Sequence, residues 1–140
     1  MHSDELIKVE QPALDQLKSL GWFYVDGRTL LPDSTDERSS FKEPILEKRL
    51  SESVKRINPW ISDENLRKII RDITKTQYAN LLEANQGIWN LLTQYVSVDQ
   101  DLGKGRKGQT VKIIDFENIE NNEFLCVNQF KVSGVNQNII

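Results

Sequence analysis

The sequence predicts an α+β fold in which amphipathic helices cover a sheet. In several segments apolar residues recur at intervals of three and four, which is the period of one helix face. Two runs near the C-terminal end are instead rich in β-branched and aromatic residues and have strand length. The length of 140 residues is that of one domain with a real core, so we predict a single domain over residues 1–140.

The two strand-like runs lie on either side of a polar linker. The first is Val111–Phe116 and the second is Phe124–Phe130. The linker, Glu117–Asn122, has three Asn residues and one apolar residue, a composition typical of a turn. We therefore predict an antiparallel hairpin, which forms the sheet on which the helices pack.

The N-terminal part of the chain predicts a helix followed by a tight turn. The helix has its apolar face over residues 13–20 and ends with Gly21 as the C′ residue. Pro12 lies either in the first turn of a short helix, which is the interpretation we favour, or at a kink in a longer helix that starts near Ser3. After the strand-like residues 22–25, Asp26-Gly27 is a signal for a hairpin or tight turn.

Three further helices are predicted in the middle of the chain. The first opens at Pro44 and stops before Asn58-Pro59, because a residue that precedes proline avoids the helical region. The second follows Ser62, an N-cap candidate, and its apolar residues fit one helix face. The third covers about residues 78–94. A strand is expected to start at residues 95–98, and another at residues 139–140.

A glycine-rich, basic segment connects the strand at residues 95–98 with the predicted hairpin. Residues 103–110 have the spacing of a phosphate-binding loop, but Gln109 stands where that motif needs lysine and no helix follows. We interpret the segment as an exposed hairpin tip. Its cations could contact a DNA backbone, and they are Lys104, Arg106 and Lys107.

Composition excludes several kinds of site. The net charge of −3 does not indicate a self-sufficient nucleic-acid binder. One Cys and one His exclude a Cys/His metal centre, and Cys126 is expected to be a buried, reduced thiol, as in a cytosolic protein. No apolar run is long enough to span a membrane. The three tryptophans are expected to be buried or half-buried, and they are Trp22, Trp60 and Trp89.

Two carboxylates at the end of the first strand-like run were considered as magnesium ligands. Asp115 and Glu117 are two residues apart and would face the same side of a strand. The simpler interpretation is a solvated strand–turn junction, for which replacement of either residue by alanine is mild.

Several short motifs follow one another in a recognisable order. Glu10 precedes Ala13–Trp22, and the later motifs are Leu46–Leu50, Arg56–Pro59, Asn85 with Leu91–Val96, Val111–Asn118 and Asn121–Phe130. The run from Asp115 to Phe130 is the most specific. Over nearly the whole chain, this order resembles the N-terminal region of the restriction (R) subunit of type I restriction-modification systems.

The resemblance implies a restriction-endonuclease-like fold of the PD-(D/E)XK type, a mixed sheet flanked by helices. The parent would be a cytoplasmic, Mg²⁺-dependent type I site-specific deoxyribonuclease that moves DNA with ATP. Its partners would be DNA and the specificity and methyltransferase subunits, with no membrane involved. In this family the carboxylates of an Asp and a Glu-x-Lys hold the metal beside the scissile phosphate, and the lysine helps to orient or activate water.

The sequence departs from the family pattern at the catalytic residues. No Asp or Glu is followed two positions later by Lys. The catalytic residues are expected beyond Ile140, so the fold would be incomplete at its C-terminus. The fragment would be inactive, and neither Mg²⁺ nor ATP would bind it specifically. Only Glu10 is carried over, as a carboxylate near the metal. The alternative is a self-contained, non-catalytic domain that binds a protein or DNA.

Overall fold

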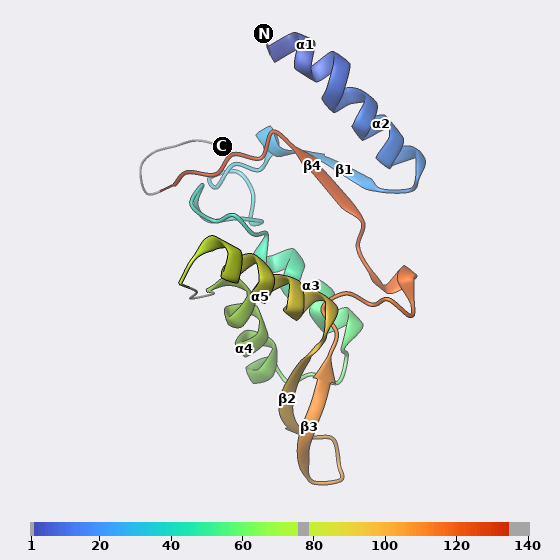
Figure 1. Cartoon of the computed structure of the whole chain (residues 1–140), viewed down its shortest axis with the longest axis vertical. Coiled ribbons are helices and arrows are strands. Elements are labelled where there is room, and N and C mark those ends of the chain that lie inside the picture. The colour runs from blue at the N-terminus through green and yellow to red at the C-terminus, as the bar shows by residue number, and fades with distance from the viewer. Residues whose placement is uncertain (1, 76–78, 135–140) are drawn as a thin grey trace. The chain divides into compact units, whose positions relative to one another are not determined.

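The computed structural model describes residues 2–75 and 79–134. Helices and short strands make the described part α+β, as predicted. The chain divides into two compact units, shown in Figure 1. We call Met1–Pro44 with Glu123–Ile140 the terminal unit, and Ile45–Asn122 the central unit. The single domain over residues 1–140 stays a prediction.

The terminal unit begins with one continuous helical rod (Figure 1). Helix α1 (His2–Glu5) leads through a π-helical stretch (Leu6–Glu10) into α2 (Gln11–Ser19). Pro12 lies in the first turn of α2, but residues 2–10 are already helical, so the favoured short helix is wrong and the longer helix from near Ser3 forms. The N–H of Gln11 donates to the Leu6 carbonyl in this wider π turn. Such a turn accommodates a proline, which has no N–H and crowds the preceding turn.

Helix α2 ends at Gly21, as predicted. Gly21 has a φ of +92°, in the left-handed region that favours glycine. Its N–H donates to the Lys18 carbonyl at 3.0 Å, and the N–H of Trp22 donates to the Leu17 carbonyl at 3.1 Å. These two bonds form a Schellman motif, which satisfies the last carbonyls of the helix.

The strands of the terminal unit pair across most of the chain length. Strand β1 (Phe23–Asp26) is parallel to β4 (Leu125–Asn128), with Phe23 opposite Leu125. The predicted hairpin across the 117–122 linker is therefore wrong. The Asp26-Gly27 turn is confirmed, but a 3₁₀ turn (Gly27–Thr29) follows it in place of a second hairpin strand.

A buried arginine joins the irregular segments of the terminal unit. Arg38 is 3% exposed, and its guanidinium donates to three carbonyl oxygens, those of Ser40, Glu43 and Lys131, at 3.2, 2.6 and 2.8 Å. The guanidinium also stacks 4.2 Å from the centre of the Phe130 ring. Because each donated bond is to backbone, Arg38 fixes the path of the loop before the central unit against the segment after β4.

The central unit contains three helices and an antiparallel strand pair. The helices are α3 (Glu47–Ile57), α4 (Asp63–Thr74) and α5 (Leu81–Thr93), and the strands are β2 (Val96–Asp101) and β3 (Arg106–Val111). Strand β2 is the one predicted to start at residues 95–98. The central core combines residues of α3, α4, both strands and the segments next to them, and these are Val54, Ile61, Ile69, Ile73, Val98, Val111 and Ile113.

Most helix boundaries agree with the sequence signals. Helix α3 begins at Glu47, after the predicted Pro44, and stops before Asn58-Pro59. The Ser62 hydroxyl accepts from the Asn65 N–H at 3.2 Å, which confirms the N-cap of α4. Residues 76–78, where the next helix was expected to start, and residues 139–140 lie outside the described part.

Three side chains are more exposed or differently placed than expected. Trp22 and Trp60 are half-buried, as predicted, whereas Trp89 on α5 is 63% exposed. Cys126 is a free thiol but only half-buried, since β4 lies in a two-stranded sheet. Strand β3 ends at Val111, so Phe116 belongs to a turn and is exposed.

Candidate functional site

Glu10 lies where the helical rod meets the end of β4. One carboxylate oxygen accepts from Nε2 of Gln129 at 2.5 Å, and the other accepts from Nδ2 of Asn128 at 3.2 Å. The hydroxyl of Tyr24 donates to Oδ1 of Asn128 at 2.8 Å, so both ends of that amide are used. Glu10 is therefore held in a fixed orientation. It lies in the middle of the rod, which excludes compensation of a helix N-terminus as its role.

Close backbone packing holds the Asn128-Gln129 segment beside Glu10. A Cβ added to Gly27 would stand 2.2 Å from the carbonyl oxygen of Asn128 and 2.8 Å from the backbone of Gln129. Only glycine fits there, at the turn that ends β1. Gln129 itself has a φ of +50°, which turns the chain away from the sheet directly after β4.

The described residues do not build a metal centre with three protein ligands at this site. No group of three His, Cys, Asp or Glu side chains lies close enough to hold a metal ion in the described ranges. A protein magnesium site uses one or two carboxylates, with water and substrate phosphates completing the shell. Glu10 could supply one such oxygen.

Asp115 is a buried turn cap, and the prediction that it is solvated is wrong. It is 4% exposed. Its carboxylate accepts from the N–H groups of Glu117 and Asn118 at 3.1 and 3.0 Å, and from Nδ2 of Asn121 at 3.0 Å. The Asn118 N–H, followed by the Asn121 amide, lowers the pKa of Asp115 below its ordinary value.

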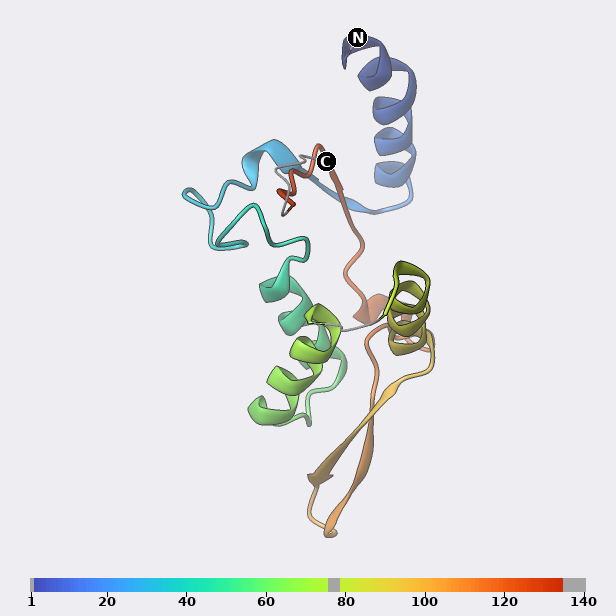
Figure 2. The same ribbon diagram turned by 60° about the vertical axis from the view of Figure 1, so that its left-hand side comes forward.

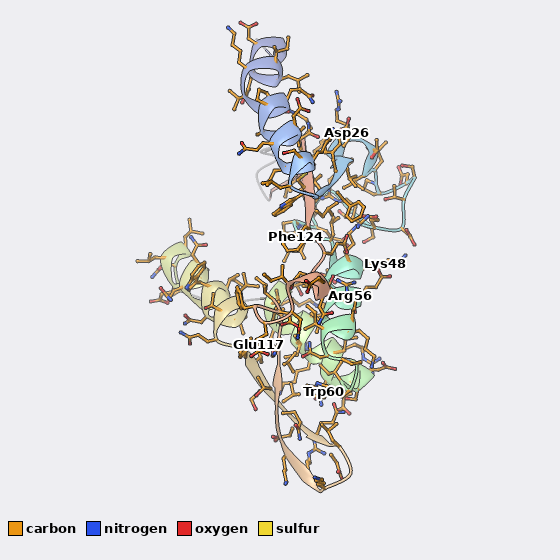
Figure 3. The ribbon with its side chains drawn as sticks, turned by 90° about the vertical axis from the view of Figure 1, so that its right-hand side faces the viewer. Asp26, Lys48, Arg56, Trp60, Glu117 and Phe124 are labelled. Atoms are coloured by element: carbon orange, nitrogen blue, oxygen red, sulfur yellow. The ribbon has the colours of Figure 1, made fainter. Side chains whose placement is uncertain are left out.

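The side chain of Glu117 is exposed, as predicted, and only its backbone N–H takes part in the Asp115 cap. Glu117 is labelled in Figure 3. Its carboxylate accepts from Nζ of Lys112 at 2.7 Å. Every oxygen of Asp115 is occupied by a donor of its own turn, so the two acids do not form a magnesium site. The short Asx-type turn replaces the strand end that the spacing suggested.

The predicted basic hairpin tip is present between β2 and β3. The strands extend from the helices of the central unit as a two-stranded arm (Figure 2). Asp101 accepts from the N–H groups of Gly103 and Gly105, which shapes the loop. Side chains alternate along a strand, so the two cations on β3 lie on opposite faces. All three cations are exposed, and they are Lys104, Arg106 and Lys107.

Comparison with known proteins decides the family. A family model described as "Type I restriction enzyme R protein N terminus" matches residues 5–140. The chain belongs to this family. It is 30% identical over 125 residues to the type I restriction enzyme HindI endonuclease subunit of Haemophilus influenzae, covering 89% of this chain and 12% of that protein.

Archaeal relatives agree with this assignment. A protein of Methanocaldococcus jannaschii named as a type I restriction enzyme MjaIXP endonuclease subunit is 35% identical over 130 residues, which are 93% of this chain. The chain spans 12% of the length of that relative. No solved structure matches. No described helix is long and apolar enough to cross a membrane.

The structure brings together residues that the sequence motifs left separate. Glu10 and the Asn128-Gln129 pair lie at opposite ends of the stretch that resembles the family, and in the structure they are joined by direct hydrogen bonds. Tyr24, which sequence reasoning did not select, completes the network through Asn128. An Asn-Gln pair at the end of a strand was the available signal, but its partner could not be identified from spacing. The role of Glu10 near a metal stays a prediction.

Proposed function

We propose that this chain is the N-terminal section of a type I R subunit whose complete form cleaves DNA in the cytoplasm. The complete protein would use Mg²⁺ for cleavage and ATP for movement along DNA, in a complex with specificity and methyltransferase subunits. Membership of the R-subunit family supports the class of activity. The chain corresponds to 12% of its relatives' length, so most of that machinery belongs to other parts of such a protein.

The observation that carries a local role is the orientation of Glu10. A carboxylate with one amide donor on each oxygen is preorganised, and both amides come from the segment that directly follows β4. We assign Glu10 as a positioning residue of the nuclease site. It would hold this segment in place and orient a carboxylate oxygen toward the site, an outer-shell role in metal enzymes.

The hairpin tip supplies the candidate DNA contact. Lys104, Arg106 and Lys107 are exposed at the end of a two-stranded arm, where a phosphate backbone can approach without moving other elements. Their positions on both faces of the arm favour contact with backbone over the reading of bases, because phosphate contact does not need one fixed face.

Restriction of unmodified phage by cells that carry the complete system tests the proposal. Glu10→Ala should lower restriction by about 10- to 100-fold, the usual cost of removing an outer-shell group. Glu5→Ala, an exposed acid on the same rod, is the matched control and should restrict normally. Normal restriction by the Glu10 variant would remove Glu10 from the site. A system that restricts normally without this section would favour a separate binding module.

A further inference from the structure

A second basic surface lies in the central unit, away from the hairpin tip. Helices α3 and α4 enclose a surface groove of about 540 Å³. Three cations recur at every fourth position of α4, on one side of the helix, and they are Arg67, Arg71 and Lys75. Lys48, near the start of α3, adds a fourth cation to the lining (Figure 3).

The cations of α4 are available to a ligand. The side chains of Arg67, Arg71 and Lys75 are exposed, and they form no hydrogen bond or ion pair with any residue that the structure describes. The other face of the same helix is committed to the core through Ile69 and Ile73. Packing therefore holds the cationic row on a rigid support, and no residue within 2–75 and 79–134 pairs with its charges.

The acids of the groove do not cancel this row. Glu47 and Glu64 line it, and each lies in the first turn of its own helix, where a carboxylate compensates the helix dipole. The three cations of the row alone therefore outnumber the two acids that line the groove. The central unit as a whole holds twelve of the eighteen Lys and Arg residues of a chain whose net charge is −3. The same unit holds eleven of the twenty-one Asp and Glu residues, so its net charge is +1, against −4 for the terminal unit.

We propose that the α3–α4 groove binds the phosphate backbone of duplex DNA. Residues four apart on a helix are separated by about 6 Å along its axis, which is a suitable spacing for a row of cations that follows the closely spaced phosphates of one strand. Arg67 and Arg71 can each donate two hydrogen bonds to a phosphate, and Ser51 offers a hydroxyl from α3. The proposal deepens the proposed function, on which it rests for the identity of the ligand.

Binding of the 140-residue chain to a fluorescent duplex, followed by anisotropy over a series of salt concentrations, tests this groove. The variant Arg67→Gln/Arg71→Gln/Lys75→Gln should lose affinity by about tenfold or more at low salt. The slope of log affinity against log salt should become shallower by about 0.9 for each lost phosphate contact. The variant Lys8→Gln/Lys42→Gln/Lys68→Gln removes the same charge from exposed positions and should keep the wild-type slope.

A charge-conserving variant of the groove separates the loss of charge from the loss of the folded structure. Arg67→Lys/Arg71→Lys keeps the charges and should retain most of the affinity, and chemical shifts of α4 amides should move when duplex is added. The proposal would be overturned if the Arg67→Gln/Arg71→Gln/Lys75→Gln variant kept the wild-type salt slope, or if it lost no more affinity for duplex than the control variant. Preference of the groove for a polyglutamate peptide over duplex would also overturn it.

A parallel variant distinguishes the groove from the hairpin tip. Lys104→Gln/Arg106→Gln/Lys107→Gln reports on the tip alone. If the tip variant loses duplex binding and the groove variant keeps it, the proposal that the groove binds duplex is overturned, while the proposed function is unaffected. If the groove variant loses duplex binding and the tip variant keeps it, the groove is supported as the contact and the hairpin tip is excluded. Absence of duplex binding by the wild-type chain would overturn both contacts.

Discussion

Asn58 binds both backbone groups of Lys112. Its Nδ2 donates to the Lys112 carbonyl at 2.7 Å, and its Oδ1 accepts from the Lys112 N–H at 2.9 Å. Nδ2 also donates to the Val54 carbonyl at 2.9 Å. Asn58 is 2% exposed, so one side chain ties the end of α3 to the chain that leaves β3, in the interior of the central unit.

Asn58→Ala should destabilise the central unit. The substitution leaves the buried backbone groups of Lys112 without partners, and unsatisfied buried polar groups are costly. We expect a loss of about 2–4 kcal/mol in the free energy of unfolding, measured by urea denaturation. Asn85→Ala, at an exposed position of α5, is the control and should change stability by less than about 0.5 kcal/mol. If Asn58→Ala lost no more stability than the Asn85→Ala control, the backbone groups of Lys112 would have found other hydrogen-bond partners.

Asp115 should make stability depend on pH. Its pKa is lowered in the folded chain, so its stabilisation is complete above the ordinary Asp pKa of about 3.9 and is lost as pH falls below that value. Melting temperatures between about pH 6 and pH 2.5 should therefore fall more steeply in the wild type than in Asp115→Asn. Parallel curves would contradict the assigned role of the charge.

The two acids of the 115–117 turn should differ sharply on truncation. Asp115→Ala frees two N–H groups and an amide, and it should lower the melting temperature by roughly 5–10 °C. Glu117→Ala removes one exposed ion pair and should lower it by less than about 2 °C. Thermal melts followed by circular dichroism compare the two, and similar effects would refute the turn-cap account.

Gly27→Ala should disrupt the segment that holds Glu10. The new methyl group would overlap the Asn128 carbonyl oxygen, which is backbone and can move only with the strand. We expect a loss of about 2–3 kcal/mol in stability and of Asn128 and Gln129 amide protection in hydrogen exchange. The control is Gly108→Ala, whose methyl group would lie 3.1 Å from the rotatable Ser97 hydroxyl. Equal effects of the two substitutions would exclude a specific clash at Gly27.

The sequence predicted local structure better than pairing. The Ser62 cap, the Gly21 end and the stop before Pro59 depend on a few neighbouring residues, and all three are confirmed. The hairpin failed because residues of equal strand propensity choose partners by tertiary packing. Strand β4 pairs with β1, about a hundred residues away, and Asp115 turns the chain before the first run can extend as a strand.

At the candidate site, too, local features were predictable from the sequence and long-range contacts were not. The family resemblance selected Glu10 and the Asn128-Gln129 motif, but their contact spans 118 positions and follows from the parallel pairing of β1 with β4. The basic tip was predictable because glycine and lysine clusters between strands are local signals. The exposure of Trp89 was not predictable, because the apolar pattern of a helix indicates an apolar face but not whether another element packs on that face.

Cleavage and ATP hydrolysis, measured together on the complete R-subunit complex, test the central claim most directly. If Glu10 serves the nuclease site, Glu10→Ala should lower the rate of double-strand cleavage by about 10- to 100-fold while ATP hydrolysis on the same DNA stays at the wild-type rate. Glu5→Ala should leave both rates unchanged. Wild-type cleavage by the Glu10 variant, or an equal loss of both activities, would contradict a role for Glu10 in DNA cleavage.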